Sequence, residues 1–225
     1  MSLQLQEQKN KTINIAITGK MRSGKDTVAK NLINLMCEQY KVHTIAFGDS
    51  LKYYAKQLFN DEFVDGRKPR ELYQWFGQTL RMRDEDIWIK QLINSVNENN
   101  SCPAPYKTTV VNIITDLRQP NEYKFCKDND FYIVKVECDD SIRVKRMKGL
   151  SDNFDPNNLT HETESFVDSY EADFTLVTSH INEEECKERV KGLIEYINKN
   201  EEKEENYNDT VSIIRFTNMY AMQNN

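Results

Sequence analysis

Five short runs of apolar and β-branched residues recur along the chain and predict the strands of one sheet. The runs occupy residues 13–18, 42–47, 109–115, 131–137 and 173–178. Most of them are apolar on both faces and do not alternate with polar residues, which is typical of strands buried in a parallel sheet. The pattern therefore predicts a sheet that is covered on both sides.

The segments between these runs show the signals of helices. Residues 26–40 carry apolar side chains at helical spacing, and Asp49 or Ser50 can cap the helix that follows the second run. We predict helices over residues 26–40, 52–59, 70–83, 85–96, 122–128, 141–148 and 183–197. Strands that alternate with helices indicate an α/β fold, with a five-stranded parallel sheet between two helical layers.

The two ends of the chain differ from this pattern. Residues 1–11 are polar and are expected to be disordered, whereas residues 12–199 form one domain. Residues 200–225 are expected to be an acidic linker and a tail, because the segment that follows residue 197 is polar and rich in glutamate. Residues 210–222 become apolar again. They either dock onto the domain or pair with a second copy as a homodimer, and the sequence leaves both open.

Composition narrows the class of protein. The chain has 225 residues, of which 38% are hydrophobic and 29% charged, as expected for one soluble globular domain. The net charge of −6 argues against non-specific nucleic-acid binding, which depends on basic surface. No apolar run approaches the ~20 residues that span a bilayer. The five cysteines are widely spaced and include no C-x-x-C pair, which favours a reducing cytoplasm over a disulfide framework or a zinc site.

The loop after the first predicted strand carries the strongest chemical signal. It reads GKMRSGKDT over residues 19–27 and matches the G-x-x-x-x-G-K part of a phosphate-binding P-loop. The motif requires a strand before it and a helix after it, and both are predicted here. Loop amides and the positive end of the helix would bind phosphate oxygens, and Lys25 would reach the outer phosphates. The predicted nucleotide-binding residues are Gly19, Arg22, Ser23, Gly24, Lys25, Asp26 and Thr27.

The residue after Lys25 departs from the general P-loop pattern, which has Ser or Thr there as a magnesium ligand. Here Asp26 occupies that position and Thr27 follows it. A carboxylate also suits magnesium, so Asp26 can ligate the ion directly or through water. Alternatively, Thr27 supplies the oxygen and Asp26 caps the helix or anchors a substrate hydroxyl. The sequence leaves these roles open.

Charged residues follow several predicted strands, at the edge where parallel α/β sheets bind ligands. Phosphoryl transfer needs cations that neutralise the moving phosphate and carboxylates that hold metal or orient the acceptor. The candidates are Asp49, Lys52, Asp116, Arg118, Arg143 and Arg146. Asp116 ends an apolar strand and is predicted to be metal-associated, unless it is a simple turn residue. Arg143 and Arg146 lie on a basic helix that is either a lid over the phosphates or a solvated face.

The predicted helices after the second strand supply further candidates. Arg70 and Arg81 flank Trp75 and Phe76, as an acceptor site with a phosphate and a base would require. Core packing is the favoured interpretation of the two aromatic residues. The sequence around His161 lacks a complete metal-binding motif, and we assign no zinc.

Several of these segments together resemble the phage-type deoxynucleoside monophosphate kinases. The segments are GKMRSGKDTVA, FGDSLK, the helix with Trp75-Phe76-Gly77 and Arg81, TDLRQPNE, HETE and YEADFTLVT, in that order over residues 13–197. The resemblance implies a P-loop NTPase three-layer sandwich of the nucleoside monophosphate kinase type with a lid. In that family Asp after Gly-Lys is usual.

The resemblance also implies the chemistry. ATP would donate its γ-phosphoryl group, with Mg²⁺ near Asp26, Thr27 and Asp116, to a deoxynucleoside monophosphate in a bacterial cytoplasm. The residues implied in catalysis are Lys25, Asp49, Arg118, Arg143 and Arg146. Those implied in substrate binding are Asp49, Lys52, Arg70, Trp75, Arg81, Asp116 and Arg118.

Two rival functions remain open. Phosphomevalonate kinases of the animal type share a similar GKD loop and a D-x-R segment, so the same fold can serve another phosphorylated acceptor. A non-catalytic nucleotide-binding module would keep the P-loop and show no acceptor-stimulated turnover.

Overall fold

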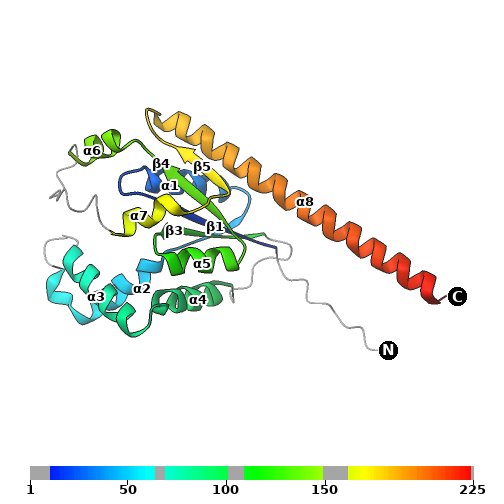
Figure 1. Cartoon of the computed structure of the whole chain (residues 1–225), viewed down its shortest axis with the longest axis horizontal. Helices are drawn as coiled ribbons and strands as arrows, with labels where there is room; N and C mark the ends of the chain where they lie inside the picture. The colour runs from blue at the N-terminus through cyan, green and yellow to red at the C-terminus, as the bar shows by residue number, and fades with distance from the viewer. Residues whose placement is uncertain (1–10, 64–68, 101–108, 149–161, 224–225) are drawn as a thin grey trace.

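The computed structural model describes residues 11–63, 69–100, 109–148 and 162–223 (Figure 1). In three helical segments, residues 97–100, 162–165 and 205–223, the structure describes the backbone alone. The prediction for residues 1–10 lies outside the described residues, as does His161.

Five parallel strands form the central sheet, in the order β2-β3-β1-β4-β5. Their bounds are β1 Thr12–Gly19, β2 Lys41–Ile45, β3 Val110–Leu117, β4 Phe131–Glu137 and β5 Phe174–Val177. The strand at the centre, β1, pairs Ile15 with Ile113 on one side and Ile17 with Val134 on the other. The predicted five-stranded parallel sheet is confirmed, and β1 delivers the P-loop to the middle of its carboxyl edge.

Two helices cover one face of the sheet. They are α1 (Lys25–Met36) and α8 (Glu183–Gln223), which lie side by side along the sheet in Figure 1. Val28 and Leu32 of α1 and Val190 and Leu193 of α8 are fully buried against isoleucines and valines of the strands. Burial of one such side chain stabilises the fold by about 1.5–3 kcal/mol, so this layer fixes the start of α1 beneath the loop.

The opposite face is covered by α2 (Phe47–Leu58), α3 (Arg70–Arg83), α4 (Ile87–Asn100) and α5 (Pro120–Asp128). Leu51, Phe76 and Trp88 bury their side chains in this layer together with Ile114 and Ile133 of the sheet. Helices α6 (Asp140–Lys148) and α7 (Glu162–Ser169) lie nearer the carboxyl edge, and a short 3₁₀ turn, Asn60–Glu62, follows α2. The two helical layers and the sheet between them make the three-layer sandwich expected from the alternation of strands and helices.

Helix α2 starts at Phe47, several residues before the predicted start, and neither Asp49 nor Ser50 is its cap. The carboxylate of Asp116, at the end of β3, accepts hydrogen bonds from the N–H groups of Phe47 (2.8 Å) and Gly48 (3.0 Å). These are two of the backbone donors that a helix start leaves unpaired. A residue far away in the sequence thus does what a local cap was expected to do.

The last helix is much longer than predicted. It was expected to end near Ile197, yet α8 continues to Gln223, through the segment expected to be an acidic linker. Gly192 is the last glycine in the chain and no proline follows it, so no strong helix breaker interrupts the segment rich in glutamate and lysine. Figure 1 shows the second half of α8 extending beyond the sheet.

Candidate functional site: a P-loop cavity

The P-loop connects the end of β1 to the first residue of α1. Arg22 and Gly24 both have left-handed backbone conformations, with φ of 62° and 94°. A β-carbon at Gly19 would lie 2.7 Å from the carbonyl oxygen of Val136, which is closer than real contacts allow. Glycine is therefore needed at position 19 for close packing and at 24 for backbone conformation.

Lys25 is held over the carboxyl end of β3. Its ammonium group donates to the carbonyl oxygen of Thr115 (2.5 Å) and to Asp26 Oδ1 (2.9 Å). The hydrogen bond from Lys25, aided by the positive charges of Lys25, Arg118 and Arg22, lowers the pKa of Asp26. The Asp26 carboxylate is thus kept ionised beside the loop, as a hard oxygen ligand must be.

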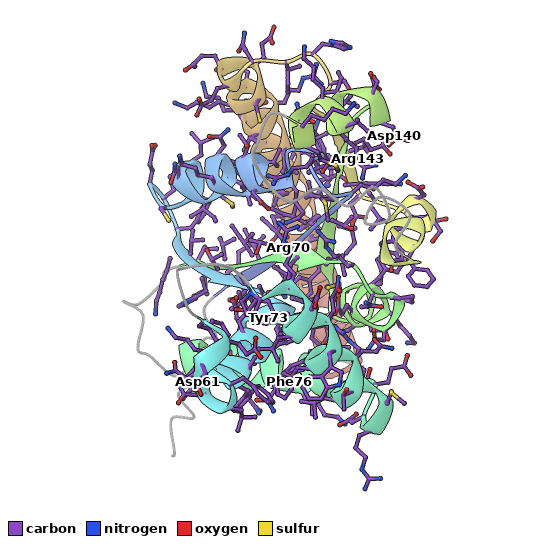
Figure 2. All side chains as sticks on the ribbon, turned by 90° about the vertical axis from the view of Figure 1, so that its left-hand side faces the viewer. Asp61, Arg70, Tyr73, Phe76, Asp140 and Arg143 are labelled. Atoms are coloured by element: carbon purple, nitrogen blue, oxygen red, sulfur yellow. The ribbon has the colours of Figure 1, made fainter. Side chains whose placement is uncertain are left out.

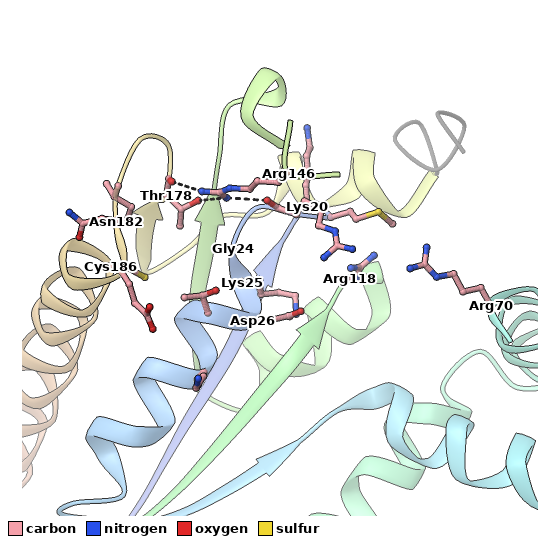
Figure 3. Close-up of a pocket in the computed structure, with 16 residues that line it drawn as sticks. Lys20, Gly24, Lys25, Asp26, Arg70, Arg118, Arg146, Thr178, Asn182 and Cys186 are labelled. Atoms are coloured by element: carbon pink, nitrogen blue, oxygen red, sulfur yellow. Dashed lines mark hydrogen bonds and ion pairs between the residues drawn. The ribbon is translucent and has the colours of Figure 1, made fainter. Parts of the chain in front are cut away.

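A cavity of about 640 Å³ opens over the P-loop (Figure 3). One wall is the loop and the start of α1, a second carries Arg70 and Arg118, and a third is the segment between β5 and α8. The cavity is lined by Lys20, Met21, Arg22, Gly24, Lys25, Asp26, Thr27, Lys30, Arg70, Arg118, Arg146, Thr178, Ile181, Asn182, Glu183 and Cys186. Seven of these side chains are cationic and two are carboxylates, so the chemistry of the walls favours an anion.

Half of the predicted site residues line this cavity. They are Arg22, Gly24, Lys25, Asp26, Thr27, Arg70, Arg118 and Arg146, which come from the loop, α3, the turn after β3, and α6. In Figure 2, Arg70 lies between Tyr73 and Phe76 of α3 on one side and Asp140 and Arg143 of α6 on the other. The structure thus brings together cations from segments that are far apart in the sequence.

The other predicted residues lie outside the cavity lining. Gly19 and Ser23 are buried within the loop, and Asp49 and Lys52 form an exposed pair (3.2 Å) on α2. Trp75 is 55% exposed and meets Phe59 edge-on at 5.8 Å, whereas Phe76 is buried. The core-packing interpretation therefore holds for Phe76, while Trp75 lies at the surface.

Arg81 points to a carboxyl group instead of the cavity. Its guanidinium lies 3.6 Å from Glu122, a buried residue of α5 that is not among the predicted site residues. Glu122 also accepts hydrogen bonds from the N–H groups of Arg118 (3.1 Å) and Gln119 (3.0 Å). Burial raises the pKa of Glu122 to about 7, and the charge of Asp116 acts in the same direction.

Asp116 is buried at the end of β3, next to the start of α2. Burial raises the pKa of its carboxyl group, against the lowering effect of the Gly48 and Phe47 hydrogen bonds and of the nearby charges of Lys25 and Lys52. The group caps α2 and lies beside Lys25, although it does not line the cavity. Its predicted role near a metal remains a prediction.

Arg143 and Arg146 lie against the P-loop backbone. Arg143 is 3% exposed and donates to the carbonyl oxygen of Met21 (2.8 Å) and to Asp140 (2.6 Å). Arg146 donates to the carbonyl oxygens of Arg22 (3.1 Å) and Thr178 (2.9 Å). The arginines predicted for a lid thus make contacts that hold the loop itself.

Eight residues that line the cavity were not predicted. One group forms the wall after β5 and consists of Thr178, Ile181, Asn182, Glu183 and Cys186. The other group is Lys20, Met21 and Lys30, in and near the P-loop. A signal for the first group did exist in the sequence. These residues follow the fifth strand, and ligands of parallel sheets lie at the carboxyl ends of the strands. The predicted polar site residues follow strands two, three and four only.

A family model described as the AAA domain matches residues 15–164, which is two thirds of the chain. The chain belongs to this AAA domain family. The match runs from β1 into α7 and includes the P-loop, Arg70, Arg118 and Arg146. The cavity wall after β5 in this AAA domain protein lies outside the matched residues. No curated protein matches the chain.

Solved structures share the fold of this AAA domain protein. TT1252 from Thermus thermophilus is 22% identical, with a TM-score of 0.50 over 83% of this chain and 97% of that one. The tunicamycin resistance protein of Deinococcus radiodurans is 10% identical, with a TM-score of 0.51 over 82% and 96%. The APS kinase of Mycobacterium tuberculosis, in complex with AMPPNP and APS, is 15% identical, with a TM-score of 0.47 over 84% and 99%. The first two likenesses confirm the predicted α/β P-loop fold.

The described residues of this AAA domain protein fit a nucleotide phosphate better than a metal on its own. Among them, no three His, Cys, Asp or Glu side chains gather so as to hold a metal ion. Asp26 and Thr27 offer oxygen ligands, and Mg²⁺ usually takes one or two protein ligands together with phosphate oxygens and water.

In the parts of the chain that the structure describes, no helix has both the length and the apolar character needed to cross a bilayer.

Proposed function

We propose that this protein is a Mg²⁺-dependent kinase that transfers the γ-phosphoryl group of ATP to a deoxynucleoside monophosphate. The observation that carries the proposal is the cavity in which the P-loop and Lys25 face Arg70 and Arg118 (Figure 3). One set of cations suits the donor phosphates and the other suits a phosphate on the acceptor. A module that only binds ATP has no need for the second set.

The loop would hold the donor. Its amides and Lys25 would bind the β- and γ-phosphates, and Lys25 would leave the Thr115 carbonyl and the Asp26 carboxylate to do so. Ile181 and Asn182, on the far wall, offer one apolar and one hydrogen-bonding side chain for the base. Mg²⁺, held by Asp26 or Thr27 with phosphate oxygens, would offset the negative charge that develops during transfer.

Arg118 and Arg70 would hold the acceptor phosphate in line with the donor. An anionic oxygen of the acceptor attacks the γ-phosphorus, a new P–O bond forms, and the bond to the β-phosphate oxygen breaks to release ADP. Because the attacking oxygen already carries negative charge, the step requires no strong general base. Catalysis then rests on positioning and on charge stabilisation by Lys25, Arg118 and Arg70.

A second acceptor class is supported by one observation. No aromatic residue lines the cavity among the described residues, and Trp75 lies at the surface. The arginines recognise phosphate and not a base, so a phosphorylated acceptor without a base, such as phosphomevalonate, fits the same cations. This alternative keeps the reaction and changes only the substrate.

A coupled ADP-release assay tests the proposal. It would use ATP, Mg²⁺ and a panel of ribonucleoside and deoxynucleoside monophosphates, with phosphomevalonate as the competing acceptor. We expect turnover with at least one deoxynucleotide, and a loss of at least about 100-fold in Lys25→Ala, as for other single charge-stabilising groups. Lys56→Ala, an exposed lysine of α2, is the matched control and should keep full turnover. ATP binding without acceptor-stimulated ADP release would instead indicate a non-catalytic module.

A further inference from the structure

Three consecutive carbonyl groups of the P-loop are bound by side chains from outside the loop. Arg143 Nε donates to the carbonyl oxygen of Met21 (2.8 Å), and a terminal nitrogen of Arg146 donates to that of Arg22 (3.1 Å). The Thr178 hydroxyl donates to the carbonyl oxygen of Ser23. Figure 3 shows Arg146 and Thr178 meeting above the loop.

The three side chains that make these bonds are themselves fixed. Arg143 and Thr178 are each 3% exposed, and Arg143 is paired with Asp140 at 2.6 Å. Arg146 bonds the carbonyl oxygen of Thr178 at 2.9 Å and so joins α6 to the end of β5. The loop is therefore held by an external framework, and its conformation does not depend on its own bonds alone.

The direction of a carbonyl decides the direction of the next amide. In a planar trans peptide the C=O and N–H groups point to opposite sides. Holding the Met21 and Ser23 carbonyls toward α6 and β5 thus fixes the N–H groups of Arg22 and Gly24. The N–H of Ser23 closes a turn to Lys20 (3.1 Å). Arg22 and Gly24 have left-handed φ angles, a conformation that the surrounding structure has to maintain, most of all at the non-glycine Arg22.

We propose that Arg143, Arg146 and Thr178 are positioning residues that clamp the P-loop in its phosphate-binding conformation. Arg143 acts only through the loop, because it does not line the cavity. Thr178 acts through the Ser23 carbonyl and Arg146 through that of Arg22, and both side chains also line the cavity. The expected effect of the clamp on ATP binding rests on the proposed function. The clamp itself is a property of the ligand-free protein.

Hydrogen–deuterium exchange of the ligand-free protein tests the clamp directly. Thr178→Val keeps the shape of the side chain and removes the hydroxyl, whereas Thr178→Ser restores the hydroxyl. Loss of one hydrogen bond should speed exchange of the peptide covering residues 19–27 by on the order of fivefold, and the serine variant should behave like wild type. Thr175→Val, an exposed threonine of β5, is the matched control and should leave the loop unchanged. Arg143→Met should speed exchange of the same peptide.

Calorimetric titration with ATP gives the second readout. Thr178→Val should weaken ATP binding about fivefold and Thr178→Ser less than twofold. A loosened loop loses conformational entropy when it becomes ordered on binding, and this loss lowers the affinity. Unchanged exchange of residues 19–27 in Thr178→Val would overturn the clamp, as would equal acceleration across the whole protein with a matching fall in Tm. If wild-type protein binds no ATP while the loop-specific exchange result holds, the proposed kinase activity fails and the clamp stands.

Discussion

The hydroxyl of Tyr170 donates a hydrogen bond of 2.9 Å to the carbonyl oxygen of Arg118. The Tyr170 ring is stacked on Tyr123 of α5, with centroids 4.3 Å apart and planes at 2°. Tyr170 is 7% exposed and directly follows α7. The connection from α7 to β5 is thus fastened to the backbone of an arginine that lines the cavity.

Removing only this hydroxyl should loosen Arg118. In Tyr170→Phe the ring stack persists, and we expect KM for the acceptor to rise by on the order of fivefold while KM for ATP stays within twofold. Tyr123→Phe is the matched control, since the Tyr123 hydroxyl bonds the carbonyl oxygen of Glu171 (3.0 Å), outside the cavity. Steady-state kinetics on both variants measures the difference. Equal effects of the two variants on KM for the acceptor would refute the role of Tyr170.

The sequence was most informative where a signal is local. The strand runs and the glycines of the P-loop each act over a few residues, and the sheet and the loop follow from them directly. The start of α2 could not be predicted in this way, because its cap is Asp116, 69 positions after Phe47. A cap supplied by another strand leaves no local trace.

Site residues on helices were harder to predict than those at strand ends. Arg118 follows directly after β3 and faces the cavity as expected, whereas the direction of a side chain on α3 depends on how that helix packs. Arg70 at the first turn of α3 faces the cavity, and Arg81 near its end faces Glu122. The spacing of arginines along one helix does not show which of its turns will face the cavity.

Glu122 should make stability depend on pH near neutrality. Its folded pKa of about 7 lies above the ordinary value of 4.5. Between these values the folded state keeps a proton that the unfolded state has lost, so the stabilising contribution is full below 4.5 and is lost as the pH rises through 7. The shift corresponds to roughly 3 kcal/mol in the free energy of unfolding. Urea unfolding at a series of pH values measures it.

Glu122→Gln should flatten that pH dependence. Both backbone bonds go to one oxygen, Oε2, which the amide oxygen of glutamine can replace. A smaller slope should remain, because burial also raises the pKa of Asp116. Glu71→Gln, an exposed glutamate of α3, serves as control and should keep the wild-type slope. An unchanged slope in Glu122→Gln would show that the group is ionised in the folded state throughout this range.

Asp26 and Thr27 can be separated by their magnesium dependence. Both line the cavity at the start of α1, and Asp26 is paired with Lys25 at 2.9 Å. If the carboxylate holds the ion, Asp26→Asn should raise the Mg²⁺ concentration for half-maximal turnover by about tenfold, and Thr27→Val should change it less than twofold. We expect this result because the Asp26 carboxylate is ionised and exposed. The reverse pattern would assign the ion to Thr27. Tm should change little in either variant, since both side chains are exposed.

The outer half of α8 should be dispensable for the fold of the domain. Among the side chains of this helix that the structure describes, up to Glu204, those buried in the core are Cys186, Val190, Leu193 and Ile197. Glu201 adds a hydrogen bond from Tyr132 (2.8 Å) and an ion pair with Lys11 (3.1 Å). Because these contacts precede residue 205, a chain ending at Glu204 should keep its Tm within about 3 °C of the full chain. By contrast, Leu193→Ala should lower the free energy of unfolding by about 2–5 kcal/mol.

Light scattering on the full and shortened chains then decides between the two roles left open for residues 210–222. A dimer formed only by the full chain would assign these residues to contact between subunits. A monomer whose Tm falls on shortening would assign them to docking on their own domain, and would refute the expectation of an unchanged Tm. Since α8 projects beyond the sheet in Figure 1, we expect the shortened chain to be a folded monomer that keeps ATP binding.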